Sequence, residues 1–154
     1  MNNLEMIIEM INYGFVLFFG IVVSLYLADI NFTDHKKAYI ITLISFGVAQ
    51  VIFYLIMGEN LLYKCYPLLI HLPLILLIWL VFHRNLYIAT ISVLSAYLMC
   101  TPRKWFGTLA ASFFHGNPMV ANIVSICVTI PLLYLVIRYI APYIIRLKYE
   151  NGKT

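Results

Sequence analysis

Long apolar runs, interrupted by charged residues only at wide intervals, constrain this chain more than any other feature. Residues 10–28, 38–58, 65–83 and 105–137 contain no Asp, Glu, Lys or Arg. A helix that crosses the hydrocarbon core of a bilayer needs about 20 apolar residues, with a range of about 17–25. Runs of this length predict several membrane-spanning helices.

The overall composition excludes an ordinary soluble domain. Hydrophobic residues make up 64% of the 154-residue chain and charged residues 10%, against roughly 45–50% and about 25% in soluble domains. A globule of this size has too much surface to hide so many apolar side chains, whereas a bilayer lets them face outward. We therefore predict an all-α, polytopic membrane helical bundle of about five spans.

The predicted spans form a single transmembrane domain over residues 1–154 and lie at about 10–28, 38–57, 67–82, 86–114 and 120–140. Region 86–114 is ambiguous because Pro102-Arg103-Lys104 divides it into a marginal and a short apolar half. It fits one long broken helix, one span followed by a re-entrant half-helix, or two short spans. We expect one span that is broken near Pro102.

The distribution of basic residues favours that single crossing. With the N-terminus outside, a single crossing places Lys36, Lys37, Arg84, Arg138, Arg146, Lys148 and Lys153 inside and Lys64 outside. Two crossings, with the N-terminus inside, would put the first three of these outside, against the positive-inside rule. We expect a multi-pass protein of the cell membrane with a cytoplasmic C-terminus, whose cationic tail is attracted to anionic lipid headgroups.

Arg103, Lys104 and Trp105 are the first candidate ligand-binding residues. A charged side chain at the bilayer centre costs ~2.5–3.5 kcal/mol on insertion scales. Two adjacent cations after Pro102 therefore indicate a polar site that receives a carboxylate or phosphate. The alternative is a loop, or side chains that extend to the interface with Trp105 as an aromatic-belt residue.

His71 is the second candidate, because it lies in a run bracketed by Pro67 and Pro73. The prolines predict a locally irregular helix with a titratable group beside it. Such a histidine is suited to ligand contact or proton sensing. The alternative is an interfacial histidine that is hydrogen-bonded to a freed carbonyl.

The remaining polar residues of the spans are predicted to join helices. They are Gln50, Ser92, Ser95, Asn122, Ser125 and Thr129. Gly14, Gly20 and Gly47 are expected to allow close helix approach, and Pro131 is expected to kink the last span.

No feature of the sequence predicts an enzyme, a metal site, a cofactor or a nucleic-acid partner. The motifs HExxH, GxSxG and Walker A are absent, and so are CxxC or Cys/His ligand spacings around Cys65, Cys100 and Cys127. None of the six acidic residues lies in the middle of a span, where a proton or cation pump usually carries one. The net charge of +4 is spread over loops rather than gathered in a basic arm.

Four segments resemble a known family. They are 66–73 (Tyr-Pro-Leu-Leu-Ile-His-Leu-Pro), 95–100 (Ser-Ala-Tyr-Leu-Met-Cys), 102–107 (Pro-Arg-Lys-Trp-Phe-Gly) and the tail 138–146. Together they resemble the N-terminal membrane sensor region of GHKL-domain sensor histidine kinases of gut Firmicutes, which are distantly similar to quorum-sensing peptide receptors. The resemblance implies a multi-span receptor with its N-terminus outside, followed in that family by two further spans, a dimerisation helix and a kinase domain. The present sequence contains no phospho-acceptor region and no ATP-binding boxes, so kinase activity is not implied.

The expected function is a sensor or receptor-like membrane module of a two-component-type system, which is non-catalytic and binds a small molecule, peptide or lipid. Expected partners are the lipid bilayer and a membrane protein or a second copy of the chain. The alternatives are a small membrane component of a transporter and a structural or regulatory membrane protein.

Overall fold

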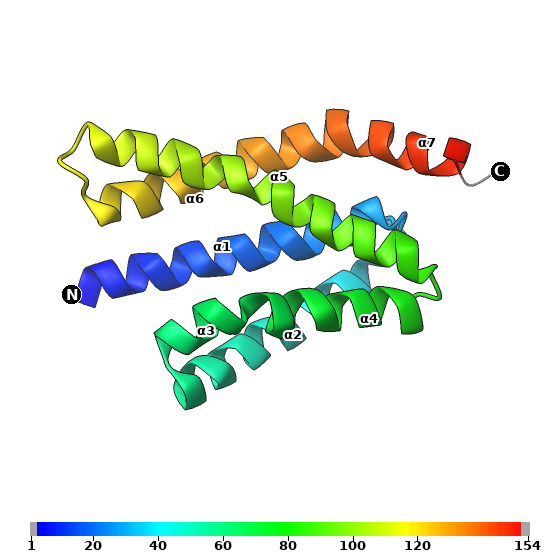
Figure 1. Ribbon diagram of the computed structural model, residues 1–154, viewed down its shortest axis with the longest axis horizontal. Helices are drawn as coiled ribbons and strands as arrows, with labels where there is room; N and C mark the ends of the chain where they lie inside the picture. The colour runs from blue at the N-terminus through cyan, green and yellow to red at the C-terminus, as the bar shows by residue number, and fades with distance from the viewer. Residues whose placement is uncertain (1–2, 152–154) are drawn as a thin grey trace.

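The computed structural model describes residues 3–151, and these fold into five helical rods without a strand. The rods are α1 (Asn3–Leu27), α2 (Lys36–Met57), α3 (Glu59–Tyr66) continued by η1 (Pro67–His71) and α4 (Leu72–Leu80), α5 (Leu86–Ser112), and α6 (Pro118–Leu135) continued by η2 (Val136–Ile140) and α7 (Ala141–Asn151). Figure 1 shows the rods lying along one common direction. The predicted all-α helical bundle is confirmed.

Three helices are long and apolar enough to cross a membrane: Asn3–Leu27, Lys36–Ile56 and Pro118–Arg146. Residues Lys64–Leu80 form a shorter apolar helix. These lengths and compositions fit the membrane protein that the sequence predicts.

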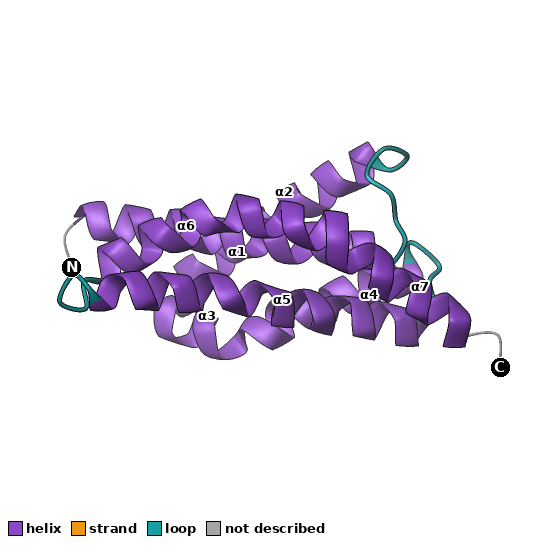
Figure 2. Ribbon diagram, turned by 90° about the horizontal axis from the view of Figure 1, so that it is seen from above, coloured by secondary structure: helices purple, strands orange, loops and turns teal. Residues whose placement is uncertain are grey.

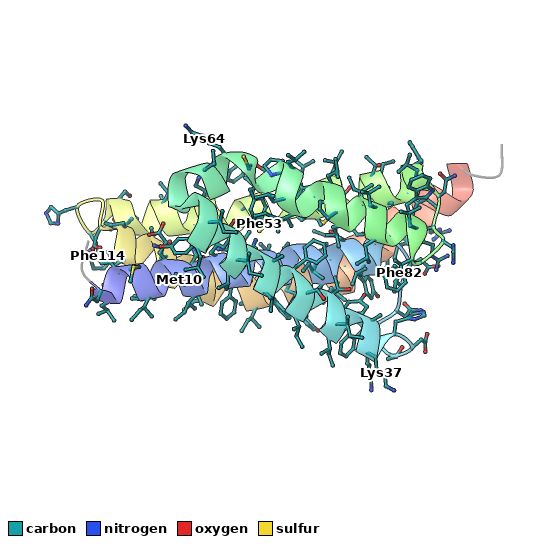
Figure 3. The ribbon with its side chains drawn as sticks, turned by 90° about the horizontal axis from the view of Figure 1, so that it is seen from below. Met10, Lys37, Phe53, Lys64, Phe82 and Phe114 are labelled. Carbon is teal, nitrogen blue, oxygen red and sulfur yellow. The ribbon has the colours of Figure 1, made fainter. Side chains whose placement is uncertain are left out.

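Successive rods run in opposite directions, so the connections gather at two ends of the bundle. The N-terminus, the α2–α3 turn and the α5–α6 loop lie at one end, which we call the N-terminal end (Figures 1 and 2). The α1–α2 and α4–α5 loops and the end of α7 lie at the other, the C-terminal end. Lys37 and Phe82 mark the C-terminal end in Figure 3, and Met10 and Phe114 lie toward the N-terminal end.

The expected break at Pro102 is wrong, because α5 is one continuous helix of 27 residues. Proline has no N–H for the carbonyl of Leu98, and the helix continues because neighbouring helices hold it on several sides. Its contacts are with α1, α4 and α6, and the buried side chains toward them include the small residues Ala96, Gly107 and Ala111. Region 86–112 therefore passes along the bundle once.

The irregular backbone lies in the π-helical turns η1 and η2. The N–H of Leu72 donates to the carbonyl of Pro67, and the N–H of Ala141 donates to that of Val136. Each turn ends two residues before a proline, Pro73 or Pro142. The wider π-helical turn moves the carbonyl groups of the preceding turn away from the proline ring, which would otherwise clash with them. The expected irregularity beside His71 is confirmed, whereas α6 stays helical through Pro131.

Helix α1 is the centre of the bundle and α2 its periphery. Helix α1 contacts α2, α5, α6, η2 and α7, and its second half is buried at Phe19, Ile21, Val23 and Leu25. Helix α2 contacts α1 and α3 and diverges from the other rods at the C-terminal end (Figure 2). Most of its large apolar side chains are exposed, as expected for a helix that faces lipid.

The close approach of helices occurs at Gly107 and not at the glycines that the sequence suggested. A Cβ atom added at Gly14, Gly20 or Gly47 would meet nothing within 4 Å. A Cβ atom at Gly107 would overlap the hydroxyl of Ser125 and the carbonyl of Ala121. Helices α5 and α6 therefore touch through backbone at this point, one turn after Arg103.

Candidate functional site

Arg103 lies inside the bundle and is only 3% exposed. Its guanidinium Nη2 donates a hydrogen bond to the side-chain oxygen of Asn12 on α1. The amide nitrogen of Asn12 donates in turn to the side-chain oxygen of Asn122 on α6, at 2.8 Å. A polar chain therefore joins α5, α1 and α6 between apolar neighbours.

A second contact joins the backbone of Arg103 to α6. The hydroxyl of Ser125 donates to the carbonyl of Arg103 at 3.3 Å, and the hydroxyl of Thr129 donates to the carbonyl of Ser125 at 2.7 Å. Asn122 and Ser125 thus join helices, as the sequence predicted for intramembrane polar residues. Together with Gly107 they position Arg103 against α6.

The guanidinium of Arg103 keeps one donor nitrogen open. Nη1 is buried and has no hydrogen-bond partner among the residues that the structure describes. Arg84 and Asp29 form an ion pair, whereas Arg103 forms none with the side chains that the structure describes. A buried charge without a counter-ion is costly unless another group satisfies it. Nη1 of Arg103 is therefore a buried cationic donor that no described residue satisfies.

His71 lies in an aromatic cluster next to this network. Its ring makes edge contacts with Tyr66 and Tyr97, with ring centroids 5.4 Å and 5.0 Å apart, and Tyr66 makes one with Tyr13 at 5.6 Å. Cys100, which precedes Arg103 by three residues on α5, lines a small cavity together with Tyr66 and His71. The structure therefore places Arg103 and His71 in one region of the bundle.

A small cavity lies within the aromatic cluster. It measures about 20 Å³ and is lined by Tyr66, His71, Tyr97, Cys100 and Ser24, together with apolar residues of α1, η1, α4 and α5; Arg103 is not among the described lining residues. A water molecule needs at least about 10–15 Å³. The cavity therefore has room for water but not for a larger molecule in this conformation.

Lys104 and Trp105 point away from the site. Both are exposed, and Trp105 is 68% exposed. Successive residues of a helix are separated by about 100° around its axis, so three adjacent residues do not share one face. Of the four residues that the sequence singled out, Arg103 and His71 are brought together and the other two are not.

The polar chain lies nearer to the N-terminal end of the bundle. Arg103 precedes the end of α5 at Ser112 by nine residues, and Asn12 follows the start of α1 at Asn3 by nine. At 1.5 Å per residue, each is about 13 Å from that helix end. The site is therefore deep enough to be shielded by the bundle.

Asn12 is the site residue that sequence reasoning missed. A lone side-chain amide in the first apolar run (residues 10–28) was the available sign, and its role depends on a partner 91 positions away. In the described part of the chain, no three His, Cys, Asp or Glu side chains are grouped so that they could hold a metal ion. Comparison of the chain with protein-family models, curated proteins and solved structures finds no match.

Proposed function

We propose that this chain is a non-catalytic, receptor-like membrane module of the two-component sensor type, which binds a carboxylate-bearing ligand at Arg103. The observation that carries the proposal is the buried guanidinium whose Nη1 has no partner among the described residues. A carboxylate matches the planar guanidinium and forms short, charge-assisted hydrogen bonds with it.

The surroundings of Arg103 favour a ligand with an apolar body. Tyr66, Tyr97 and His71 form an aromatic cluster whose cavity is also lined by Cys100, three residues before Arg103 on α5. The water-sized cavity means that a peptide or small molecule must displace a helix segment on binding. The π-helical turn η1, which carries His71, is suited to this because such turns interrupt the regular hydrogen-bond ladder and are frequent at functional sites.

Helix α6 provides a route from the site to the opposite end of the bundle. Its residues Asn122 and Ser125 contact Asn12 and the backbone of Arg103. Helix α6 continues through η2 into α7, which ends at the C-terminal end (Figure 1). A ligand that favours a different position of Arg103 would shift α6 and thereby α7. These contacts of α6 with the site favour a sensor over a passive structural protein.

The proposed topology places the site toward the outside of the cell. Lys36, Lys37 and Arg84 lie at the C-terminal end of the bundle, and the acidic residues Glu5 and Glu9 lie in the first turns of α1 at the N-terminal end. The positive-inside rule assigns the first end to the cytoplasm. The polar chain, being nearer to the N-terminal end, would then face ligands that arrive from outside.

The binding claim is tested with matched acid and amide probes. Purified protein in neutral detergent is titrated with N-acetyl-Phe-Leu, N-acetyl-Leu-Leu and decanoate, and with the corresponding amides, while the melting temperature is recorded. We expect at least one free acid, but not its amide, to raise the melting temperature. Arg103→Met should abolish this increase, and Lys104→Met, the exposed neighbour, should retain it. Equal responses to acids and amides, or an unchanged response in Arg103→Met, would contradict the proposal.

The coupling claim is tested with a label on α6. Cys127 is exposed, so replacement of Cys65 and Cys100 by alanine leaves one accessible thiol for a fluorinated or fluorescent probe. We expect the acid that stabilises the protein to change the label's spectrum, and Arg103→Met to remove the change. Binding without any spectral change would support a ligand carrier instead of a sensor.

A further inference from the structure

A groove on the outer face of the bundle lies where α6 and η2 pass α1. It measures about 380 Å³, and its lining includes Tyr26 of α1, Ile130, Leu133 and Tyr134 of α6, and Ile137 and Arg138 of η2. It is therefore far larger than the interior cavity beside His71, and its walls come from other residues.

Arg138 is the charged group of this groove. Its side chain is exposed, and it has no hydrogen bond or ion pair with any side chain that the structure describes. Among the residues that the structure describes, no acidic side chain lines the groove. The groove therefore presents an uncompensated positive charge next to apolar and aromatic surface.

The position of Arg138 along the helix suits a lipid headgroup. Tyr26 immediately precedes the last residue of α1, Leu27, so this part of the groove lies near the C-terminal end. Ile130 precedes Arg138 by eight residues, which places it about 12 Å farther into the bundle. Tyrosines such as Tyr26 and Tyr134 are typical of the level where hydrocarbon meets headgroups. The groove thus changes from apolar to cationic along the direction of a lipid molecule.

We propose that this groove binds an anionic phospholipid, with the phosphate at the guanidinium of Arg138 and an acyl chain along Ile130 and Leu133. Charge complementarity selects a lipid with net negative charge, because a basic pocket between membrane helices attracts acidic headgroups. The apolar length of the groove selects a lipid over a bare anion, which would gain nothing from Ile130 or Leu133. This site is independent of the carboxylate site that we propose at Arg103.

The test measures lipid preference in the whole chain. Native mass spectrometry of the protein in neutral detergent, with equal concentrations of phosphatidylglycerol and phosphatidylcholine, reports which lipid is retained. We expect wild type to prefer phosphatidylglycerol and Arg138→Gln to lose about fivefold of that preference, the factor that corresponds to one basic residue at a membrane surface. Arg138→Lys should keep most of it.

Three controls decide the interpretation. Lys37→Gln removes an exposed cation at the same end of the bundle and should leave the preference unchanged; an equal loss would indicate diffuse attraction and overturn the site. Glycerol phosphate, which has no acyl chain, should not displace the bound lipid, and displacement would reveal a bare-anion site. Arg103→Met should keep the preference, so that failure of the carboxylate proposal leaves this one separately measurable.

Discussion

Arg103 and Arg138 both lie on apolar helical rods, but one is buried in the bundle and the other is exposed. Arg103 is 3% exposed and donates to Asn12, whereas Arg138 is exposed and faces a groove on the outer surface. Arg138 lies near the level of the last residues of α1, where a long side chain can reach headgroups. Arg103 lies deeper and on an inward face, so protein amides must solvate it. The difference shows that depth and helix face, rather than residue type, decide whether an arginine of these helices is buried or exposed.

The close contact of α5 and α6 at Gly107 helps to enclose Arg103. Breaking this contact should produce the largest loss in the free energy of unfolding. In Gly107→Ala, the added Cβ must displace the carbonyl of Ala121, which is backbone and cannot move alone. We expect a loss of up to ~3 kcal/mol in the free energy of unfolding, measured by thermal and denaturant unfolding in detergent. Arg103 should then become as accessible as Arg138.

Gly47→Ala is the matched control, because a Cβ atom there meets nothing within 4 Å. Alanine favours a helix over glycine by roughly 1 kcal/mol, so this variant should be unchanged or slightly more stable. Equal melting temperatures for the two alanine variants would show that the α5–α6 contact does not depend on Gly107.

Asn12 should be more important than Asn122, because Asn12 stands between the arginine and the second amide. Asn12→Ala removes the acceptor of a charged donor and leaves Arg103 buried without a hydrogen bond to a side chain, at a cost of ~2 kcal/mol. Asn122→Ala removes one neutral interhelical bond, worth ~0.6 kcal/mol in membranes. Unfolding measurements on both single variants and the double variant give the coupling between them. A larger loss of unfolding free energy in Asn122→Ala than in Asn12→Ala would mean that the hydrogen-bonded chain from Arg103 to Asn122 does not depend on Asn12.

Much of the fold could be predicted from the sequence, because uncharged runs of sufficient length specify spans almost by themselves. The single pass of residues 86–112 along the bundle agrees with the expectation drawn from charge placement, and the irregular turn at His71 followed from its two prolines. The continuity of α5 through Pro102 could not be predicted, since it depends on packing against α1, α4 and α6. A proline breaks a helix only where nothing re-satisfies or confines the backbone.

The site was predicted less well than the fold, for a geometric reason. The prediction grouped Arg103, Lys104 and Trp105 because they are adjacent, but a helix directs adjacent residues to different faces. The helices are apolar on nearly every side, so hydrophobic periodicity does not identify the inward face. The partner Asn12 and the contact at Gly107 both depend on which helices become neighbours, and local sequence carries little information about that.

Replacing each of the two arginines by methionine removes its charge and tests the comparison more sharply. Burying Arg103 costs ~2.5–3.5 kcal/mol on insertion scales, and its charged hydrogen bond returns ~1.5–3 kcal/mol. Arg103→Met should therefore change the unfolding free energy by no more than ~2 kcal/mol, while acid binding is lost. Arg138→Met should leave stability unchanged in neutral detergent. A loss of several kcal/mol in Arg103→Met would show that this arginine is a structural brace rather than a ligand site.

Arg84 provides an intermediate case and the smallest expected effect. Its Nη2 donates to the backbone carbonyl of Asp29 at 2.6 Å and lies 3.6 Å from the carboxylate oxygen Oδ2, with the two side chains 37% and 39% exposed. This contact ties the α1–α2 loop to the α4–α5 loop, but water screens it. Arg84→Gln should therefore cost only ~0.5 kcal/mol, and high salt should reduce the difference from wild type. A loss as large as that of Asn12→Ala, or one that is independent of salt, would mean that the bond to the carbonyl carries the contact. Partial exposure of an arginine would then not be enough to make its contact contribute little to the free energy of unfolding. Depth alone would not explain the contrast between Arg103 and Arg138.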